Sequence, residues 1–330
     1  MPERIIAAVI VSFIAFFTVY FLSPFLIKAL EKRNLTVKDY HREGGAMVAR
    51  PGGPSIIAGI LISELVLYVF FPIVEIIAII ITTSLAFLVG FVDDRRVMGG
   101  WFKPVALAAS AIPILLLGAY DYHLAFPLFG VVSIPLLYFG LVIVMITVTG
   151  NTVNSIDVLN GVASGFMAIA SFALTISLFI IQNYEIALAS LPLGFVCLAF
   201  YKYHKFPSKI FPGDSGALVI GAMYGTIAIV GGVEIIAAVA LLPAIFNSFL
   251  FLSSMKRIVE HREIKSKPVV LTEDFKLKAT PHKDSPVTLV RLIVAREPLT
   301  EKQIGFVIFR LGIFSGILAI ITAFMMGVVL

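Results

Sequence analysis

Long apolar segments, separated by polar stretches, recur from one end of the chain to the other. A membrane-spanning helix needs about 20 apolar residues to cross about 30 Å of hydrocarbon. Ten segments satisfy this pattern: 5–30, 54–71, 73–92, 104–119, 131–149, 162–181, 186–201, 215–231, 233–252 and 304–329. They are apolar around the whole helix circumference, as lipid-facing or bundled helices must be. The pattern predicts an all-α polytopic membrane protein with about ten transmembrane helices.

The composition excludes a water-soluble enzyme and a disordered chain. Of the 330 residues, 59% are hydrophobic and 14% are charged, and the mean hydropathy is +1.03. A soluble domain typically has about 45–50% apolar and about 25% charged residues. The single cysteine, Cys197, excludes an intramolecular disulfide framework and a cysteine-only zinc site.

The polar loops carry the basic residues on one side of the predicted membrane. Five connections fall on one face: 31–53, 93–103, 150–161, 202–214 and 253–303. Together with their flanks they contain every Lys and Arg except Arg4 and Arg310. The positive-inside rule makes this face cytoplasmic and places both termini outside a plasma membrane. The net charge of +5 is therefore a topology signal, and nucleic acid is not expected as a partner.

The chain is predicted to form one integral membrane domain, 1–330, with no repeat and no appended soluble domain. In the last loop, Phe275, Leu277 and Ala279 alternate with lysines. Together with the stretch 268–271, across a turn at 272–274, this alternation predicts a small hairpin on the membrane surface.

Two adjacent carboxylates, Asp93 and Asp94, close the third predicted span. A solvated helix end would need only one acid beside Arg95 and Arg96. Two acids at a helix C-terminus oppose the helix dipole. Both a solvated end and a role in cation binding or proton transfer fit the pair.

The third loop contains amide and acid side chains at a spacing of three residues, and it has no Lys or Arg. The residues are Asn151, Asn154, Asp157 and Asn160. On a helical turn this spacing places them near one face. Capping would explain one of them, whereas hard oxygen donors in this arrangement suit Mg²⁺ bound with phosphates and water.

Two further polar runs lie on the same face. In 206–216, Pro212 and Gly213 predict a turn, and Asp214 follows at the start of the next span, where a plain helix cap is the simpler interpretation. In 280–286, His282 lies among cations and is followed by Arg291. A lone loop histidine is usually only solvated.

The four runs together favour phosphoryl transfer over each simpler interpretation. Acids clustered with a metal, and cations for phosphate, fit a reaction in which catalysis is mostly positioning and charge neutralisation. The residues that share the face are Asp93, Asp94, Asp157, Asp214, Lys103, His282 and Arg291. A nucleotide-linked donor would come from the cytoplasm and a lipid acceptor from the bilayer.

These motifs resemble those of the polyprenyl-phosphate N-acetylhexosamine-1-phosphate transferases. Asp93-Asp94 is similar to the family's Asp-Asp motif, and Lys103 stands where similar members have a lysine. The segment 151–161 resembles the family's Asn/Asp-rich loop, and 209–216 resembles its Phe-x-Gly-Asp motif. The four motifs occur in order over nearly the whole chain.

The resemblance implies a role for each motif. Asp214 would be the central Mg²⁺ ligand, with Asn154 as second ligand and Mn²⁺ as a substitute ion. Lys103 would meet the pyrophosphate, and Asp93 or Asp94 would assist the lipid phosphate or the metal. The remaining implied site residues are Asp157 as a catalytic carboxylate and Asn151, Asn160, His282 and Arg291 as substrate contacts.

Departures from the family pattern narrow the range of substrates that the resemblance implies. Only His282 stands where bacterial members have several histidines, Asn160 stands where the bacterial translocase usually has Asp, and Asp157 follows the bacterial pattern. The mixture resembles an archaeal-type enzyme that uses UDP-GlcNAc and dolichyl-type phosphate at the first membrane step of N-glycosylation. Another UDP-N-acetylhexosamine or undecaprenyl phosphate is the alternative, and a homodimer is compatible with the sequence.

Two rival classes remain. A secondary transporter would place charges at mid-membrane in broken helices, where Glu64 is the one acidic residue. A membrane prenyltransferase would need two Asp-rich motifs with more widely spaced carboxylates than Asp93-Asp94.

Overall fold

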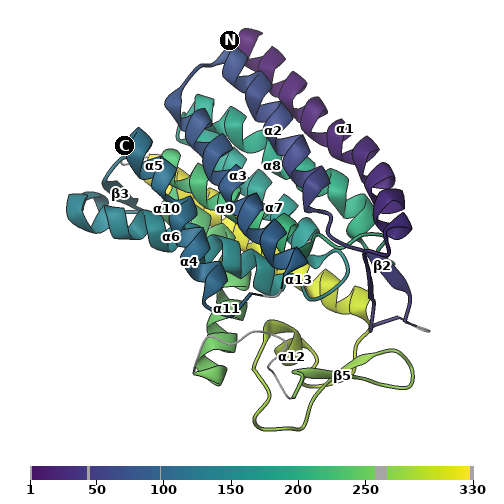
Figure 1. The fold of residues 1–330 in the computed structure, drawn as a ribbon. Helices are drawn as coiled ribbons and strands as arrows, with labels where there is room; N and C mark the ends of the chain where they lie inside the picture. Colours follow the sequence, from purple (N-terminus) through teal and green to yellow (C-terminus); the bar gives the residue numbers. More distant parts are fainter. Residues whose placement is uncertain (1, 43–44, 97, 257–265, 328–330) are drawn as a thin grey trace.

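A computed structural model describes residues 2–42, 45–96, 98–256 and 266–327 (Figure 1). Parts of the predicted loops 31–53, 93–103 and 253–303, and the end of the last predicted span, lie outside the described residues. Eight long helices form the body: α1 Pro2–Lys32, α2 Gly53–Phe70, α3 Val74–Arg95, α6 Pro135–Ile156, α7 Val162–Ile180, α8 Tyr184–His204, α9 Gly213–Val230 and α13 Glu301–Gly327.

The shorter elements connect and extend this body. They are helices α4 Phe102–Ser110, α5 Ile112–Leu117, α10 Glu234–Ala240, α11 Leu242–Met255 and α12 Leu289–Ile293, and strands β1 Thr36–Lys38, β2 Met47–Ala49, β3 His123–Phe126, β4 Gly130–Ser133, β5 Val269–Leu271 and β6 Leu277–Ala279. The strands form three separate antiparallel hairpins, β1–β2, β3–β4 and β5–β6.

The structure confirms the all-α polytopic membrane fold. Among the described residues, eight helices are long and apolar enough to cross a membrane, or nine if the bent pair α10–α11 is one span. Two of the ten predicted spans are interrupted in the structure. The predicted span 233–252 is broken into α10 and α11, which are bent by 75°, and the predicted span 104–119 is divided into the short helices α4 and α5.

Proline explains both breaks. Pro113 is the second residue of α5 and Pro243 is the second residue of α11. Proline lacks the backbone N–H that would continue the preceding helix, but it is tolerated in a first turn. Pro135 acts in the same way at the start of α6, so the predicted span 131–149 begins with strand β4 and its helix runs instead from Pro135 to Ile156.

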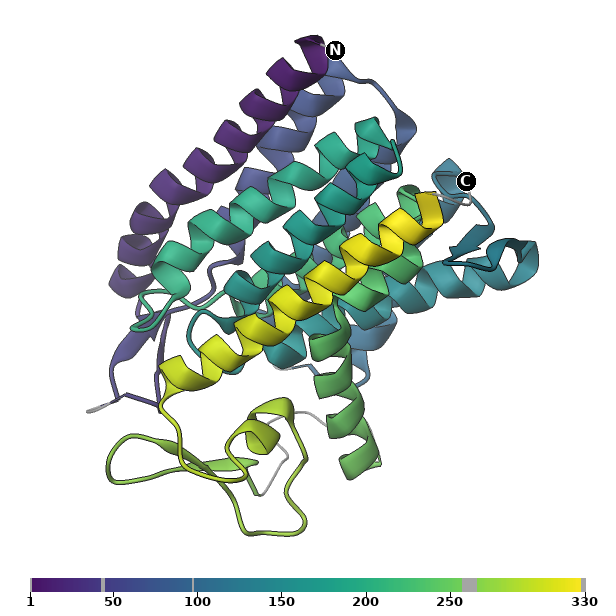
Figure 2. The same cartoon turned by 180° about the vertical axis from the view of Figure 1, so that it is seen from behind.

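Helix α9 lies at the centre of the bundle. Its apolar window is 94% buried within the protein, against 22% for the peripheral α1. It packs against α2, α3, α6 and α8, and the two cartoon views show it enclosed by these helices (Figures 1 and 2). A side chain at the first turn of α9 is therefore surrounded by the ends of several other helices.

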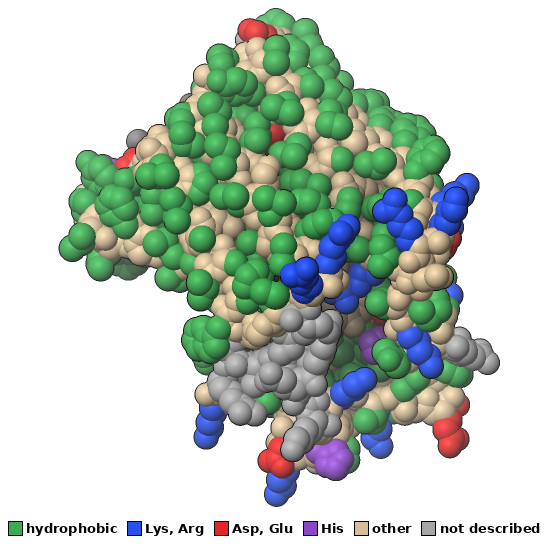
Figure 3. Space-filling view, viewed as in Figure 1, with side chains coloured by type: hydrophobic (Ala, Val, Ile, Leu, Met, Phe, Trp, Pro, Cys, Tyr) green, Lys and Arg blue, Asp and Glu red, His purple; other side chains and the backbone are tan. Residues whose placement is uncertain are grey.

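One end of the molecule carries most of the basic side chains that are visible in Figure 3. In Figure 3, Lys and Arg side chains gather over the end with β2, β5 and α12, and hydrophobic side chains cover most of the rest of that face. The start of α1 and the end of α13 lie at the other end (Figures 1 and 2). We call the end with β1–β2 and β5–β6 the charged end. The charge separation agrees with the predicted distribution of basic loops.

The hairpin predicted in the last loop is confirmed. Strands β5 and β6 pair antiparallel, with Val269 opposite Ala279 and Leu271 opposite Leu277. Hairpin β1–β2 at the charged end and hairpin β3–β4 at the other end were not predicted from the sequence.

Candidate active site at the charged end

The turn before α9 places Asp214 at the centre of the charged end. Gly213 has φ +71°, a left-handed conformation that favours glycine. A Cβ atom there would lie 2.7 Å from Cβ of Pro51 and 2.8 Å from both carboxylate oxygens of Asp94. The turn therefore needs glycine both for its backbone conformation and for the close approach of its neighbours.

Asp94 caps α9 from a different helix. Its Oδ1 accepts a hydrogen bond from the Asp214 backbone N–H at 2.9 Å, and its Oδ2 accepts from the Ser215 N–H at 2.9 Å and the Ser215 hydroxyl at 2.6 Å. The first N–H groups of a helix have no partner within it, and the dipole there favours an anion. The acid that is unfavourable at the end of α3 is therefore favourable at the start of α9.

Three donors from distant parts of the chain converge on the Asp214 carboxylate. Oδ1 accepts from Lys103 Nζ at 2.5 Å and from Asn154 Nδ2 at 3.1 Å, and Oδ2 accepts from an Arg50 guanidinium nitrogen at 2.7 Å. We define the Asp214 cluster as Asp93, Asp94, Asp214, Arg50, Lys103 and Asn154.

The two cations of the Asp214 cluster each bridge two acids. Lys103 also pairs with Asp93 at 2.8 Å, and Arg50 also pairs with Asp94 at 3.2 Å. Burial alone would lower the pKa of Arg50, but the carboxylates of Asp94 and Asp214 outweigh it and raise this pKa. Three acids face two cations, so the cluster keeps an excess of negative charge.

A close helix contact fixes the position of the cluster. A Cβ atom on Gly90 of α3 would lie 2.5 Å from Cα of Ser215 and 2.6 Å from the carbonyl carbon of Asp214. The backbones of α3 and α9 therefore meet here with no room for a side chain. This contact holds Asp94 against the first turn of α9.

Asp157 lies beside the Asp214 cluster and pairs with a buried histidine. Its Oδ1 is 3.5 Å from Nε2 of His204, whose Nδ1 hydrogen-bonds with the Ser164 hydroxyl at 2.9 Å. Burial, together with the negative charges of Asp214 and Asp94, raises the pKa of Asp157 to about 7 even though Arg50 opposes the shift. Asp157 can therefore change its protonation state near neutral pH.

The Asn/Asp-rich segment does not present its four side chains on one face. Helix α6 ends at Ile156, and Asp157 leaves the helical conformation with ψ 58°. The Asn151 amide donates back to the Thr147 carbonyl of its own helix at 2.8 Å. Asn154 contacts Asp214, and Asn160 lies among other acids, described next.

Asn160 contacts two buried carboxylates. Its Nδ2 donates to Glu301 Oε1 at 2.7 Å and to Asp39 Oδ2 at 3.2 Å, while its Oδ1 accepts from the Ser208 N–H at 2.9 Å. Asp39, His41 and Glu301 bring one potential metal-ligand atom each within 4.8 Å of one another. We define the Glu301 cluster as Asp39, His41 and Glu301.

The two expected substrate contacts in the last loop have different surroundings. Arg291 donates to four backbone carbonyls, those of Ser285, Pro286, Thr280 and His282. His282 has an exposed side chain. Within the described part of the chain, neither side chain forms a hydrogen bond or ion pair with Asp214.

Hydrogen bonds through Asn247 nevertheless tie this loop to the Asn/Asp-rich segment. The Asn247 Oδ1 accepts from the Leu289 N–H at 2.9 Å, and its Nδ2 donates to the Ser155 carbonyl at 3.1 Å. The start of α12 is therefore fixed to the end of α6.

Sequence reasoning missed Arg50 and His204. Arg50 counted only as one of many basic residues in a loop, although Pro51-Gly52-Gly53 directly before an apolar span repeats the kind of turn seen before Asp214. His204 has a weaker signal, a histidine at the end of an apolar helix, and its partner Asp157 is 47 positions away in numbering.

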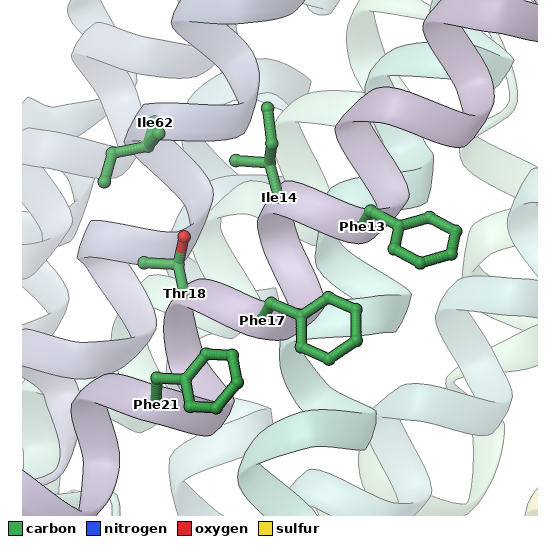
Figure 4. Close-up of a pocket in the computed structure, with 6 residues that line it drawn as sticks. All are labelled: Phe13, Ile14, Phe17, Thr18, Phe21 and Ile62. Carbon is green, nitrogen blue, oxygen red and sulfur yellow. The ribbon is translucent and has the colours of Figure 1, made fainter.

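A shallow apolar groove on the side of the bundle carries no chemistry. Figure 4 shows Phe13, Phe17 and Phe21 on one side of α1, with Ile62 on the neighbouring α2. Its lining contains no charged residue, and such a surface suits contact with lipid.

The fold and site define a polytopic membrane protein whose buried acids and cations are gathered at one end of a helical bundle. The sequence matches Glycosyl transferase family 4 over residues 76–232, a range that includes Asp93, Asp94, Lys103, Asn154 and Asp214. Together with a 30% identical relative that covers 92% of this chain, the match shows that the chain belongs to this family, and it is a membrane glycosyltransferase.

Two relatives cover nearly the whole chain, and a third covers most of it. A Methanocaldococcus jannaschii protein, provisionally named as a glycosyltransferase, is 30% identical over 92% of this chain and 93% of its own length. A Saccharolobus solfataricus protein, provisionally named UDP-N-acetylglucosamine–dolichyl-phosphate N-acetylglucosaminephosphotransferase, is 23% identical over 96% of this chain and 97% of its own. The phospho-N-acetylmuramoyl-pentapeptide-transferase of Caldicellulosiruptor bescii is 28% identical over 72% and 81%.

Proposed function

We propose that this protein transfers N-acetylglucosamine-1-phosphate from UDP-GlcNAc to a dolichyl-type polyprenyl phosphate and releases UMP. The observation that carries the proposal is the convergence of Lys103, Arg50 and Asn154 on Asp214 at the first turn of the central helix. The name of the Saccharolobus solfataricus relative supports this donor and this acceptor. In a plasma membrane, the charged end would face the cytoplasm and both termini would lie outside.

The donor set of the Asp214 cluster fits a divalent cation. Asp214 and Asn154 offer hard oxygen atoms, and the cluster has more acids than cations. Mg²⁺ in proteins is bound by one or two carboxylates together with substrate phosphates and water. We propose that Asp214 and Asn154 hold Mg²⁺, or Mn²⁺ in its place, which would neutralise charge on the pyrophosphate.

Lys103 and Arg50 are placed to exchange partners when a donor arrives. Both now pair with carboxylates, and both keep part of their side chain exposed, 18% and 32%. A pyrophosphate entering the site offers them new anionic oxygens, while Asp214 becomes free for the metal. We propose that these two cations neutralise the donor phosphates in the reaction.

The reaction is proposed to be a single displacement. A phosphate oxygen of the lipid acceptor attacks the β-phosphorus of UDP-GlcNAc, and the bond from this phosphorus to the bridging oxygen breaks, so UMP leaves with the electron pair. Phosphate is already anionic near neutral pH, and bringing two anions together needs mainly positioning and charge neutralisation. Asp93 would orient the acceptor or take its residual proton.

Asp94 is proposed to position Asp214 and not to act as a covalent nucleophile. Both of its oxygens already accept hydrogen bonds, from the backbone of Asp214, from Ser215 and from Arg50. A nucleophile needs a free lone pair directed at the phosphorus. Asp93 is the carboxylate left for a covalent route.

The reaction class is tested with labelled UDP-GlcNAc, Mg²⁺ and dolichyl phosphate. We expect label in the lipid phase and an equal amount of UMP. Parallel reactions with UDP-GalNAc and with undecaprenyl phosphate measure the preference for sugar and lipid. Lipid labelling in none of these reactions, by a folded protein, would contradict the proposal.

The single displacement has its own test. With lipid phosphate rigorously absent, labelled UMP should not exchange into UDP-GlcNAc, and adding the lipid product should restore the exchange. Exchange without lipid would reveal a phosphosugar-enzyme and replace direct attack by a covalent route through Asp93.

A further inference from the structure

The Glu301 cluster joins two distant parts of the chain at the charged end. Asp39 and His41 follow strand β1, and Glu301 is the first residue of α13. The three side chains bring potential ligand atoms, two carboxylate oxygens and one imidazole nitrogen, within 4.8 Å of one another. Asn160 lies between them and belongs to the third loop.

The two acids of this cluster are buried with little positive charge nearby. Asp39 is 3% exposed and Glu301 is 6% exposed. In the described part of the chain, no Lys or Arg forms an ion pair with either carboxylate, and the nearest basic group is His41, whose Nδ1 is 3.8 Å from Glu301 Oε1. Burying two carboxylates so close together is unfavourable unless a cation or a proton compensates them.

One carboxylate oxygen of Glu301 has no hydrogen-bond partner among the described residues. Oε1 accepts from the backbone N–H and from the side chain of Asn160, whereas Oε2 is buried and accepts no hydrogen bond from the described part of the chain. An unsatisfied buried acceptor destabilises the folded protein, and it does so more strongly when it is charged. This free lone pair, within the same carboxylate that faces Asp39 and His41, indicates a missing ligand.

The donor chemistry indicates which ligand. Mg²⁺ prefers oxygen donors alone and keeps several waters. Two carboxylate oxygens and one imidazole nitrogen are a set that zinc and related transition metals bind, with a further position left for water. The partly exposed side chain of His41 gives the ion a route from solvent.

We propose that Asp39, His41 and Glu301 bind one divalent transition-metal ion, with Zn²⁺ as the test ion, at a site separate from the Asp214 cluster. The ion would fasten the first loop to the start of α13 and hold the two carboxylates that orient Asn160. The proposal is independent of the transfer reaction.

The experiment measures zinc in the purified full-length protein in detergent. The protein is stripped with EDTA, dialysed against Zn²⁺ in excess Mg²⁺, and analysed by elemental mass spectrometry. We expect the wild type to retain one equivalent more Zn²⁺ than His41→Gln and Glu301→Gln. Asp214→Asn and His282→Gln are matched controls that should retain the wild-type amount.

A second measurement, the Tm with and without Zn²⁺, keeps the test informative if a variant folds poorly. Because a ligand that binds only the folded state stabilises it, Zn²⁺ should raise the Tm of the wild type by about 3 °C or more. His41→Gln changes a partly exposed side chain, and its Tm should not respond to Zn²⁺. Equal zinc retention and equal Tm response in wild type and His41→Gln, or no retention by either, would overturn the site and leave a shared proton between the carboxylates as the explanation.

Discussion

The Asp214 cluster and the Glu301 cluster differ in what balances their buried acids. In the Asp214 cluster, Arg50 and Lys103 each bridge two carboxylates. In the Glu301 cluster, the partners of the two carboxylates are the Asn160 side-chain amide, the backbone N–H groups of Asn160 and His41, and a more distant imidazole. Both clusters lie at the charged end, and the segment 150–161 contributes an amide to each.

The two clusters are therefore suited to different tasks: the Asp214 cluster to exchanging ligands, and the Glu301 cluster to holding parts of the chain together. Lys and Arg side chains are long and can transfer their hydrogen bonds from a carboxylate to a phosphate, so the Asp214 cluster is suited to receive and release an anionic substrate. The Glu301 cluster has no side chain that could change partners in this way, and a bound ion would be held among elements that are themselves packed. Acids whose charge is balanced by mobile side chains therefore suit catalytic turnover. Acids whose charge is balanced by a fixed ion suit a structural role.

Substituting Asp214, the centre of the Asp214 cluster, should give the largest loss of activity. We expect Asp214→Asn to lower turnover by at least about 10³-fold, because the substitution removes the carboxylate charge that would hold the divalent ion. Asp274→Asn, which changes an exposed acid in the β5–β6 turn, should keep near-normal activity. Wild-type turnover of Asp214→Asn in saturating Mg²⁺ would contradict the assignment.

Removing the mobile cation Lys103 should give the second largest loss of activity. We expect Lys103→Ala to lower kcat by about 10²-fold, since an ammonium group would no longer neutralise the pyrophosphate. Lys103→Arg should not restore the rate, because a planar fork differs from a point charge. The control is Lys278→Ala on the exposed face of β6. If Lys103→Ala left kcat and KM unchanged, the role of this lysine would be only to anchor its helix at the membrane interface.

Displacing the Asp214 cluster without changing its chemistry should give a smaller effect. A Cβ atom on Gly90 would lie 2.5 Å from Cα of Ser215, so Gly90→Ala should push α9 away from Asp94. We expect a loss of about 1–3 kcal/mol of stability from overpacking and a fall in kcat of about 10-fold. Zinc retention at the Glu301 cluster should not change.

Gly140→Ala provides the matched control for this test. A Cβ atom at Gly140, also inside a long helix, would have no atom of the described residues within 4 Å. Its activity and Tm should stay close to those of the wild type. If Gly90→Ala behaved in the same way, the close contact of α3 with α9 would not determine the geometry of the site.

The membrane fold could be predicted because hydrophobic length is a local property of the sequence. The breaks in two spans could not be predicted in this way. Pro113 and Pro243 lie inside apolar segments, and a single proline hardly changes the mean hydropathy of such a segment. The hairpin β3–β4 was hidden for a similar reason, because it adjoins the apolar start of a predicted span.

The members of the site could be predicted in part, but their pairings could not. Motif positions indicated Asp214, Lys103 and Asn154 as partners on one face. The pairing of Arg50 with Asp214 spans 164 positions, and it depends on how the starts of α2 and α9 pack. The division of Asn154 and Asn160 between two clusters depends on where α6 ends, and a spacing of three residues does not specify this.

The smallest expected effect concerns the pH dependence of stability through Asp157. Burial and the nearby carboxylates raise its pKa from 3.8 to about 7 in the folded protein. The folded state therefore holds one more proton than the unfolded state between pH about 4 and 7, and the free energy of unfolding falls as pH rises through this window. By pH 8 the loss is complete, so the Tm at pH 8 should be about 2–4 °C below that at pH 6.

Asp157→Asn tests this assignment because it cannot ionise. We expect the Tm of this variant to change less between pH 6 and 8 than that of the wild type, by the amount that Asp157 contributes. Asp284→Asn, which changes an exposed acid in the last loop, should keep the wild-type slope. An Asp157→Asn slope equal to that of the wild type would mean that another group carries the pH dependence and that the carboxylate beside His204 is already ionised at pH 6.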